Sequence, residues 1–373
     1  MGYNSRTREM KKMFQSAIMA FIILCGLQLT GCNPSEGNNP SNSKTELWPA
    51  KGSNGKWGYI NKKGSFVIQP NYSDAGIFSC GYACVELNGT SMYIDTDGKI
   101  QYTASNGNDL APFVNNYAVV HENNSRVGIL DKNFNYVVQP IYYDLSDFVA
   151  TNGLIAFQYS SGEKYGFIDV KTGKVAIQPQ YDNVWYPFHG DYAVVRQNYK
   201  CGIINKAGEY TVQPVYNKIW PLGKDLFVCE KETLRYDRYG IMDGKGNIIV
   251  NEIYSYIRDG YTDYGYIPLG NLIAVRNNND KYGYIDLNGK EIIPFQYDYA
   301  YPFVEGYAVV ELNNRQMIIN QTGDVVFLLD ESEYTDDEIS DYRGFINGLI
   351  LTYKNGSYRY RDTEGNIIYL WND

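Results

Sequence analysis

Few residues of the chain have the types and spacing that catalysis requires. The only histidines, His121 and His189, stand near no recognisable serine or cysteine nucleophile motif, and two histidines are too few for a histidine-rich metal site. The patterns GxSxG and HExxH do not occur. We therefore expect no catalytic residue, no cofactor and no enzymatic activity.

Two acidic turns have the composition of calcium-loop fragments. They are DTDG at residues 95–98 and DGKGN at residues 243–247. Neither is followed by the carboxylate that such a loop needs at its twelfth position. We interpret both as hairpin turns, expect no metal site, and interpret the acidic run at residues 330–341 as a solvated loop.

The N-terminus has the features of a bacterial lipoprotein signal. A basic start precedes an apolar run at residues 17–29, which is too short for a full membrane span. The next residues, Leu29, Thr30, Gly31 and Cys32, resemble a lipobox, which implies acylation of Cys32. We predict a signal peptide over residues 1–31 and a flexible tether over residues 32–49; an uncleaved N-terminal helix is the alternative.

The charge of the chain argues against an anionic ligand. Its net charge is -9, and removal of residues 1–31 takes away four basic residues and one acidic residue, which gives about -12. We therefore expect no nucleic acid partner.

Four cysteines remain besides Cys32 and the signal-peptide Cys25. Cys84 and Cys229 occupy strand positions where sibling copies have Val, so we expect small buried side chains there. The best candidate disulfide joins Cys201 to Cys229, provided that their Cα atoms lie within about 7 Å.

Nine repeat copies cover residues 50–373, at spacings of 34 to 43 residues. An anchor residue, usually Gly, is followed three residues later by Asp or Asn in every copy, and in eight copies by Gly six or seven residues later. This pattern predicts a tight β-hairpin that begins at each anchor. Short β-prone runs such as AVV and FVIQP supply further strands, and Pro70, Pro140, Pro179 and Pro214 are predicted to end the third strand of their copies.

The repeat resembles the WG repeat family, also called KWG repeats. The resemblance rests on Lys56-Trp57-Gly58, Lys164-Tyr165-Gly166 and Lys281-Tyr282-Gly283, together with the Asp-x-x-Gly turns and the QPxY ends. The family is defined by its repeat, so the resemblance implies an architecture and a loosely defined binding role. Several copies here have Tyr, as at Tyr165, Tyr239 and Tyr282, and one has Cys201, at the Trp position.

We expect an all-β fold of three or four short antiparallel strands per unit, organised as one repeat domain. A β-propeller-like ring is favoured because four-stranded blades bury their edges well, and an open β superhelix is the alternative. The recurring aromatic residues Trp57, Tyr165, Tyr239 and Tyr282 are candidate binding residues that could stack on sugar rings. The competing interpretation is that they pack between adjacent units.

These features predict a non-catalytic scaffold, lipid-anchored through acyl chains on Cys32, that binds another envelope protein. Glycan or peptidoglycan binding through exposed aromatic residues is the second hypothesis, and a propeller enzyme without visible motifs is the third. We expect the protein in the bacterial cell envelope, facing the periplasm or the surface. Asn33 after the lipobox favours the outer membrane.

Overall fold

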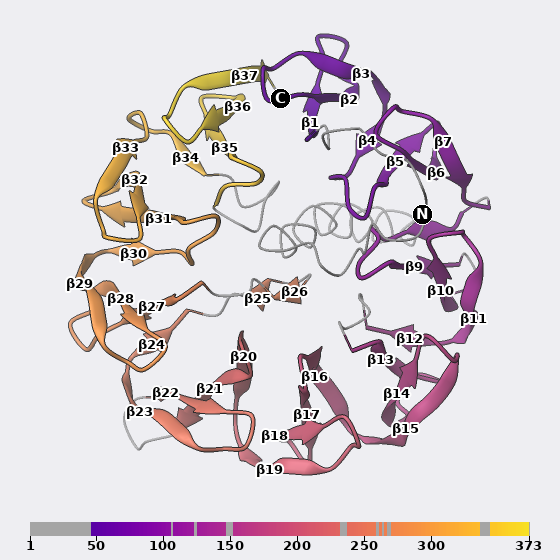
Figure 1. Ribbon diagram of the computed structural model, residues 1–373, viewed down its shortest axis with the longest axis vertical. Coiled ribbons are helices and arrows are strands. Elements are labelled where there is room, and N and C mark those ends of the chain that lie inside the picture. The colour runs from indigo at the N-terminus through magenta and orange to yellow at the C-terminus, as the bar shows by residue number, and fades with distance from the viewer. Residues whose placement is uncertain are drawn as a thin grey trace, which may run out of the picture.

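The repeats form a ring of small antiparallel sheets (Figure 1). The computed structural model describes residues 46–105, 107–122, 125–146, 152–231, 237–258, 261–262, 265–266, 270–335 and 344–372. Eight sheets have four strands and the first has three, so the fold is a nine-bladed β-propeller. The all-β prediction is confirmed, and the ring is the correct alternative. The predicted signal peptide, lipobox and Cys32 lie outside the described residues.

We number the blades 1 to 9 in chain order, so that blade 1 contains β1–β3, blade 2 contains β4–β7 and blade 9 contains β34–β37. The strands of each blade follow one another outward from the ring centre, as Figure 1 shows. The innermost strands are β4 (Asp74–Ala75), β8 (Asp109–Leu110), β12 (Asp144–Leu145), β16 (Asn183–His189), β20 (Ile219–Gly223), β24 (Tyr256–Ile257), β30 (Tyr299–Ala300) and β34 (Tyr334–Thr335). The second strands are β1 (Trp48–Lys51), β5 (Ala83–Leu87), β9 (Tyr117–His121), β13 (Leu154–Gln158), β17 (Tyr192–Gln197), β21 (Leu226–Lys231), β27 (Leu272–Arg276), β31 (Tyr307–Leu312) and β35 (Leu349–Lys354).

The third strands carry the anchors, and the outer strands form the circumference. The third strands are β2 (Trp57–Ile60), β6 (Thr90–Ile94), β10 (Val127–Asp131), β14 (Tyr165–Asp169), β18 (Lys200–Asn205), β22 (Arg238–Asp243), β28 (Tyr282–Asp286), β32 (Arg315–Asn320) and β36 (Ser357–Asp362). The outer strands are β3 (Phe66–Tyr72), β7 (Ile100–Thr103), β11 (Tyr136–Tyr142), β15 (Lys174–Tyr181), β19 (Tyr210–Tyr216), β23 (Ile248–Tyr254), β29 (Glu291–Tyr297), β33 (Val325–Leu328) and β37 (Ile367–Asn372). An extra hairpin, β25 (Tyr261–Thr262) and β26 (Gly265–Tyr266), projects from blade 7 toward the centre (Figure 1).

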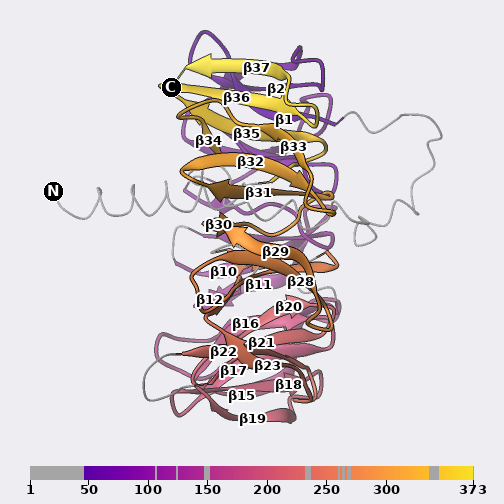
Figure 2. The ribbon, with the colours of Figure 1, turned by 90° about the vertical axis from the view of Figure 1, so that its left-hand side faces the viewer.

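Seen edge-on in Figure 2, the ring is much thinner than it is wide. None of the described segments forms a helix that is long and apolar enough to cross a membrane.

The ring closes by side-chain packing between blade 9 and blade 1. The Tyr360 hydroxyl donates to Pro49 O at 3.0 Å, and the Tyr369 hydroxyl donates to Lys51 O at 2.9 Å. Trp57 and Trp371 pack edge to face with ring centroids 6.2 Å apart. Trp48 is buried in the same seam, so the end of the segment predicted as tether belongs to blade 1.

The hydrophobic core lies between neighbouring blades. One cluster joins Phe167 and Ile177 of blade 4 to Phe188 and Val195 of blade 5. Every described blade contributes to such shared clusters, because a single small sheet cannot bury its own apolar faces. Stability therefore depends on contacts between blades.

Steric contact with the outer strand explains why most anchor positions have glycine. In blade 4, the pairing of β14 with β15 passes from Tyr165↔Tyr181 to Phe167↔Ile177, so β15 bulges over Gly166. A Cβ on Gly166 would lie 2.6 Å from Ile177 O. The copies that carry Met92, Met317 or Arg359 at this position lack that bulge, because their outer strands pair directly with the anchor residue.

The prolines do not end the outer strands, contrary to the prediction. Pro70 lies inside β3, which continues to Tyr72, and Pro140, Pro179 and Pro214 have equivalent places. Each lies in a bulge on an outer strand, where no further strand requires a backbone N–H.

The predicted Asp/Asn turns are present. In blade 8, Gly323 N donates to Asn320 O at 3.0 Å, and the Asn320 side-chain oxygen accepts from Thr322 N and Asp324 N, each at 3.0 Å. The Asn320 side chain thus accepts the hydrogen bonds of two turn N–H groups that have no backbone acceptor within the turn. Gly323 has a φ of +87°, which explains the glycine requirement.

Blade 3 breaks the glycine rule with Phe134, whose φ is +61°. Its ring packs on Tyr82 and Tyr102 at centroid distances of 5.2 Å each. This packing must offset a left-handed backbone that costs a bulky residue roughly 1–2 kcal/mol.

We therefore expect both Phe134→Gly and Phe134→Ala to be less stable than the wild type, with the glycine variant about 1 kcal/mol more stable than the alanine variant. Both variants lose the aromatic packing, but only Gly removes the φ penalty. Urea denaturation measures the order, and an alanine variant that equals or exceeds the glycine variant would refute this explanation.

Candidate functional site

The four candidate binding aromatics differ in burial. Tyr239 and Tyr282 are only 8% and 5% exposed, so neither can stack on a sugar ring, and the stacking prediction is wrong for these two. Trp57 and Tyr165 are half-buried, and the Trp57 ring packs at the closure seam. A continuous row of four exposed rings is therefore not present.

The hydroxyl groups of these tyrosines also have partners. The Tyr165 hydroxyl donates to Asp144 Oδ2 at 2.8 Å, and the Tyr239 hydroxyl donates to Glu230 Oε1 at 3.1 Å. Burial, reinforced by the neighbouring carboxylates, raises the pKa of both phenols. Both side chains therefore remain neutral hydrogen-bond donors inside the ring.

The predicted Cys201–Cys229 disulfide is absent, and this prediction is corrected. Both residues are fully buried free thiols in one apolar cluster. Cys201 Sγ instead contacts Asn217 O at 3.5 Å, and burial raises the pKa of Cys229 to about 12. The two side chains act as small hydrophobic residues, as expected for Cys229. Cys84 is also a free thiol, but it is only partly buried.

The basic residue before the aromatic position links neighbouring blades. Lys164 of blade 4 pairs with Asp182, whose other oxygen accepts Asn198 N of blade 5 at 2.6 Å. The hydrogen bond from Lys164 lowers the pKa of Asp182. Lys281, Asp298 and Asn313 repeat this arrangement between blades 7 and 8.

The same links show that the turns between second and third strands and the connections between blades lie on one face. We call this the hairpin face. Arg126 makes a related link there, because its Nη1 donates to Ile141 O and to Tyr159 O at 3.1 and 3.2 Å. Lys164 and Lys281, which precede the aromatic position in their copies, thus link neighbouring blades.

Tyr199 is the most exposed large side chain on the hairpin face. It is 84% exposed at the tip between β17 and β18. Asn198 and Tyr199 have φ values of +50° and +65°, which are unfavourable for an aromatic residue. The exposed ring at this turn makes Tyr199 a candidate functional residue.

Arg196 lies beside this ring and beside Trp185. Its guanidinium carbon lies 4.6 Å from the Trp185 ring centroid and 5.9 Å from that of Tyr199. Arg196 Nη2 donates to Tyr199 O at 3.3 Å, whereas its buried Nε has no hydrogen-bond partner within the described structure. Two aromatic rings thus fix the cation near the surface.

Two more exposed tyrosines extend this surface onto blade 4. Tyr143 is 45% exposed and Tyr159 is 42% exposed. The tip that carries Tyr159 is tied to the Tyr199 tip through Lys164, Asp182 and Asn198. We name the tyrosine patch the set of five residues Tyr143, Tyr159, Trp185, Arg196 and Tyr199.

The repeat pattern alone does not predict the tyrosine patch. Its signal was nevertheless present, because Tyr199 stands at a tip where other copies have Gly89, Asn314 or Gly356. A large aromatic residue at a position that favours Gly or Asn is costly for a turn. Comparison of copies at the tips, rather than at the anchors, would have found it.

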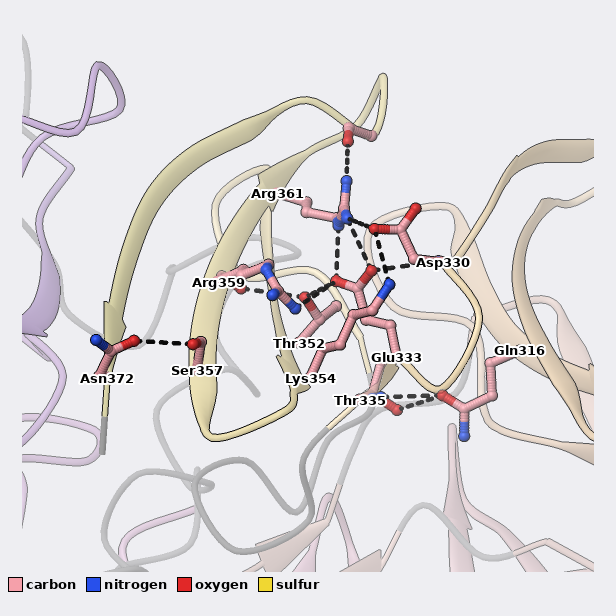
Figure 3. Close-up of polar contacts among 11 residues, drawn as sticks. Gln316, Asp330, Glu333, Thr335, Thr352, Lys354, Ser357, Arg359, Arg361 and Asn372 are labelled. Atoms are coloured by element: carbon pink, nitrogen blue, oxygen red, sulfur yellow. Dashed lines mark hydrogen bonds and ion pairs between the residues drawn. The ribbon is translucent and has the colours of Figure 1, made fainter.

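A cluster of hydrogen-bonded polar side chains lies where blades 8 and 9 meet, as Figure 3 shows. Arg361 donates from Nε and Nη2 to the two oxygens of Glu333 at 2.8 and 2.7 Å. The Thr352 hydroxyl donates to Glu333 Oε1 at 2.5 Å, and Asp330 lies 3.2 Å from Arg361. Glu333 is 4% exposed, so this part of the acidic run is a buried ion pair and not the solvated loop we predicted. Residues 336–341 lie outside the described residues.

The acidic turns have structural roles as well. Asp95 Oδ1 accepts from Asp97 N and Lys99 N at 3.0 and 2.9 Å, and Asp243 is similarly engaged.

Burial lowers the pKa of His121. Across the described ranges, no group of three His, Cys, Asp or Glu side chains is placed to hold a metal ion.

The structure therefore defines a nine-bladed propeller with an aromatic and cationic patch on one face. Five segments match the family described as WG containing repeat, at residues 57–90, 128–161, 165–201, 202–230 and 282–315. The first segment begins on β2 and ends at the start of β6, so one sequence repeat spans parts of two blades.

Solved structures with a similar chain path include a eukaryotic initiation factor, at 13% identity and a TM-score of 0.49, covering 78% of this chain and 89% of that one. BamB from Moraxella catarrhalis has 14% identity and a TM-score of 0.37, with coverage of 78% and 96%. AztD from Citrobacter koseri has 14% identity and a TM-score of 0.37, with coverage of 76% and 92%. A search of curated proteins finds no match.

Proposed function

We propose that the protein is a non-catalytic scaffold, anchored by lipid on Cys32, that binds another protein of the bacterial envelope through the tyrosine patch. The observation that carries this proposal is Tyr199, whose ring is 84% exposed at a strained tip. A solvated turn would gain nothing from such a residue.

The composition of the patch supports a protein partner. Tyr, Trp and Arg are the residue types enriched among those that dominate protein–protein binding energy. Trp185 and Tyr199 already orient the Arg196 side chain, so binding of a partner would cost little of that side chain's conformational entropy. Exposed polar residues such as Asp182 and Asn183 stand beside the rings, as at the polar rim of an interface.

The second hypothesis, glycan binding, has weaker support. A sugar site needs free hydrogen-bonding groups beside its aromatic platform. Both oxygens of Asp182 already accept hydrogen bonds, from Lys164 and from Asn198 N. Glycan binding is therefore retained as an outcome of the test.

The test is affinity capture by the tagged full-length protein from detergent-solubilised envelope. We compare the wild type with Tyr199→Asn, which keeps a residue suited to the left-handed tip, as at Asn314. We expect capture of one protein partner by the wild type and at least about a tenfold loss of affinity in Tyr199→Asn, because the central ring of an interface contributes strongly to binding.

Tyr334→Ala is the control at an exposed tyrosine outside the patch, because Tyr334 lies on blade 9 and is 44% exposed. Tyr334→Ala should capture the partner as well as the wild type does. Equal capture by wild type and Tyr199→Asn would show that the patch is not the interface, and capture of sugar without protein would favour the glycan hypothesis.

A further inference from the structure

The outer edges of the blades differ in how they resist pairing with another strand. Five outer strands contain a proline within a bulge, at Pro70, Pro140, Pro179, Pro214 and Pro294. Proline and bulges both prevent the addition of a strand to an edge. β23 has the bulge without the proline.

β33 has neither the proline nor the wide bulge. It pairs with β32 from Met317↔Leu328 to Ile319↔Val325 with a single register shift. Val325, Val326 and Leu328 are 51%, 36% and 45% exposed, so the edge presents apolar side chains to solvent. β7 exposes one such side chain. β37 exposes Ile367 and Leu370, but it packs on blade 1 through Tyr369 and Trp371.

The backbone of Leu328 faces outward. Leu329 N donates to Gln316 O at 3.1 Å, so the next pair, Met317↔Leu328, is the pair without mutual hydrogen bonds. The N–H and C=O of Leu328 therefore point away from β32. In the part of the chain that the structure describes, no strand pairs with this side of β33.

The charges at the two ends of β33 indicate which kind of segment could pair with it. The exposed Asp324 precedes β33, and the exposed Glu331 follows it, whereas Asp330 already pairs with Arg361 and Lys354. A second copy pairing antiparallel through the same edge would bring its acidic ends against these acidic ends. A segment with basic residues at its ends would instead be attracted at both.

We propose that β33 is a docking edge for an extended segment of a different polypeptide, apolar at its centre and flanked by Lys or Arg. The segment adds to blade 8 as a fifth strand, and its backbone pairs with Leu328. This surface lies on the circumference and is separate from the tyrosine patch, so it goes beyond the proposed function.

The test uses the full-length protein and a fluorescein-labelled peptide, Lys-Val-Thr-Val-Thr-Val-Lys, with binding followed by fluorescence anisotropy. We expect saturable binding to the wild type. Leu328→Pro should weaken it at least tenfold, because proline removes the outward donor, whereas Leu328→Thr, which keeps that donor, should stay within about threefold.

A second pair of measurements does not depend on the proline variant folding. A peptide that is N-methylated at alternate residues should not bind, and Asp324→Lys should weaken binding of the Lys-flanked peptide. Absence of binding to the wild type, equal binding of the methylated peptide, or equal binding to Leu328→Pro would overturn the proposal. A concentration-dependent dimer that Leu328→Pro abolishes would overturn the chosen occupant in favour of a second copy.

Discussion

Glu333→Gln is expected to lower the free energy of unfolding by about 3 kcal/mol, because it leaves the buried Arg361 with only the more exposed Asp330 as a counter-charge. Glu333 accepts two hydrogen bonds from Arg361 and one from Thr352, and its side chain has no exposed surface. Arg359 Nη1, 4.0 Å from the same carboxylate, would also lose its nearest negative charge. The measurement is urea denaturation at neutral pH.

The same ion pair makes stability depend on pH. Burial alone would raise the pKa of Glu333, but hydrogen bonds from Arg361 and Thr352 outweigh it and lower the pKa. Its stabilising contribution is therefore present above the unfolded pKa of about 4.3 and is lost as pH falls through the lower folded pKa. Glu333→Gln should lack this part of the acid-induced loss of stability.

Glu364→Gln is the matched control, because Glu364 is an exposed turn residue in the same blade. It should change stability by less than about 0.5 kcal/mol. If Glu333→Gln were as stable as this control, the ion pair between Glu333 and Arg361 would not stabilise the fold.

Gly166→Ala is expected to cost about 2–3 kcal/mol, as overpacking in a well-packed region does. The added Cβ would lie 2.6 Å from Ile177 O and 2.8 Å from Pro179 N. Both contacts are with backbone atoms of β15, so no side chain can move aside. A lower urea midpoint is the expected observation.

Gly270→Ala serves as the control, because a Cβ there meets no atom within 4 Å. It should unfold at nearly the wild-type urea concentration. An unchanged midpoint for Gly166→Ala would mean that the bulge yields easily and that the anchor glycine has another cause.

Local features of the fold could be predicted because they depend on residues close in sequence. Asn320 and Gly323 specify a hairpin turn through their own hydrogen bonds and φ, and the same pair of residue types recurs in other copies. Pro179 was misinterpreted as a strand end because the chain alone does not say that β15 is an outer edge. Ring closure was equally hidden, since it depends on contacts such as Tyr360 with Pro49.

The candidate site was less predictable. The recurring aromatics attracted attention because they repeat, but repetition here reflects the shared packing of Tyr239 and Tyr282. The exposed Tyr199 does not repeat, and its importance depends on a turn geometry that one copy alone does not reveal. Glu333 and Arg361 are 28 residues apart in the chain, and only the fold brings them together.

The most direct test of the functional account is photo-cross-linking in cells that produce the protein. A photoreactive p-benzoylphenylalanine replaces Tyr199 in the full-length protein, and a second variant carries it at Asn314, the corresponding tip residue of blade 8. The account predicts a discrete protein adduct at position 199 and none at position 314. The absence of an adduct at 199, or equal adducts at both tips, would contradict it.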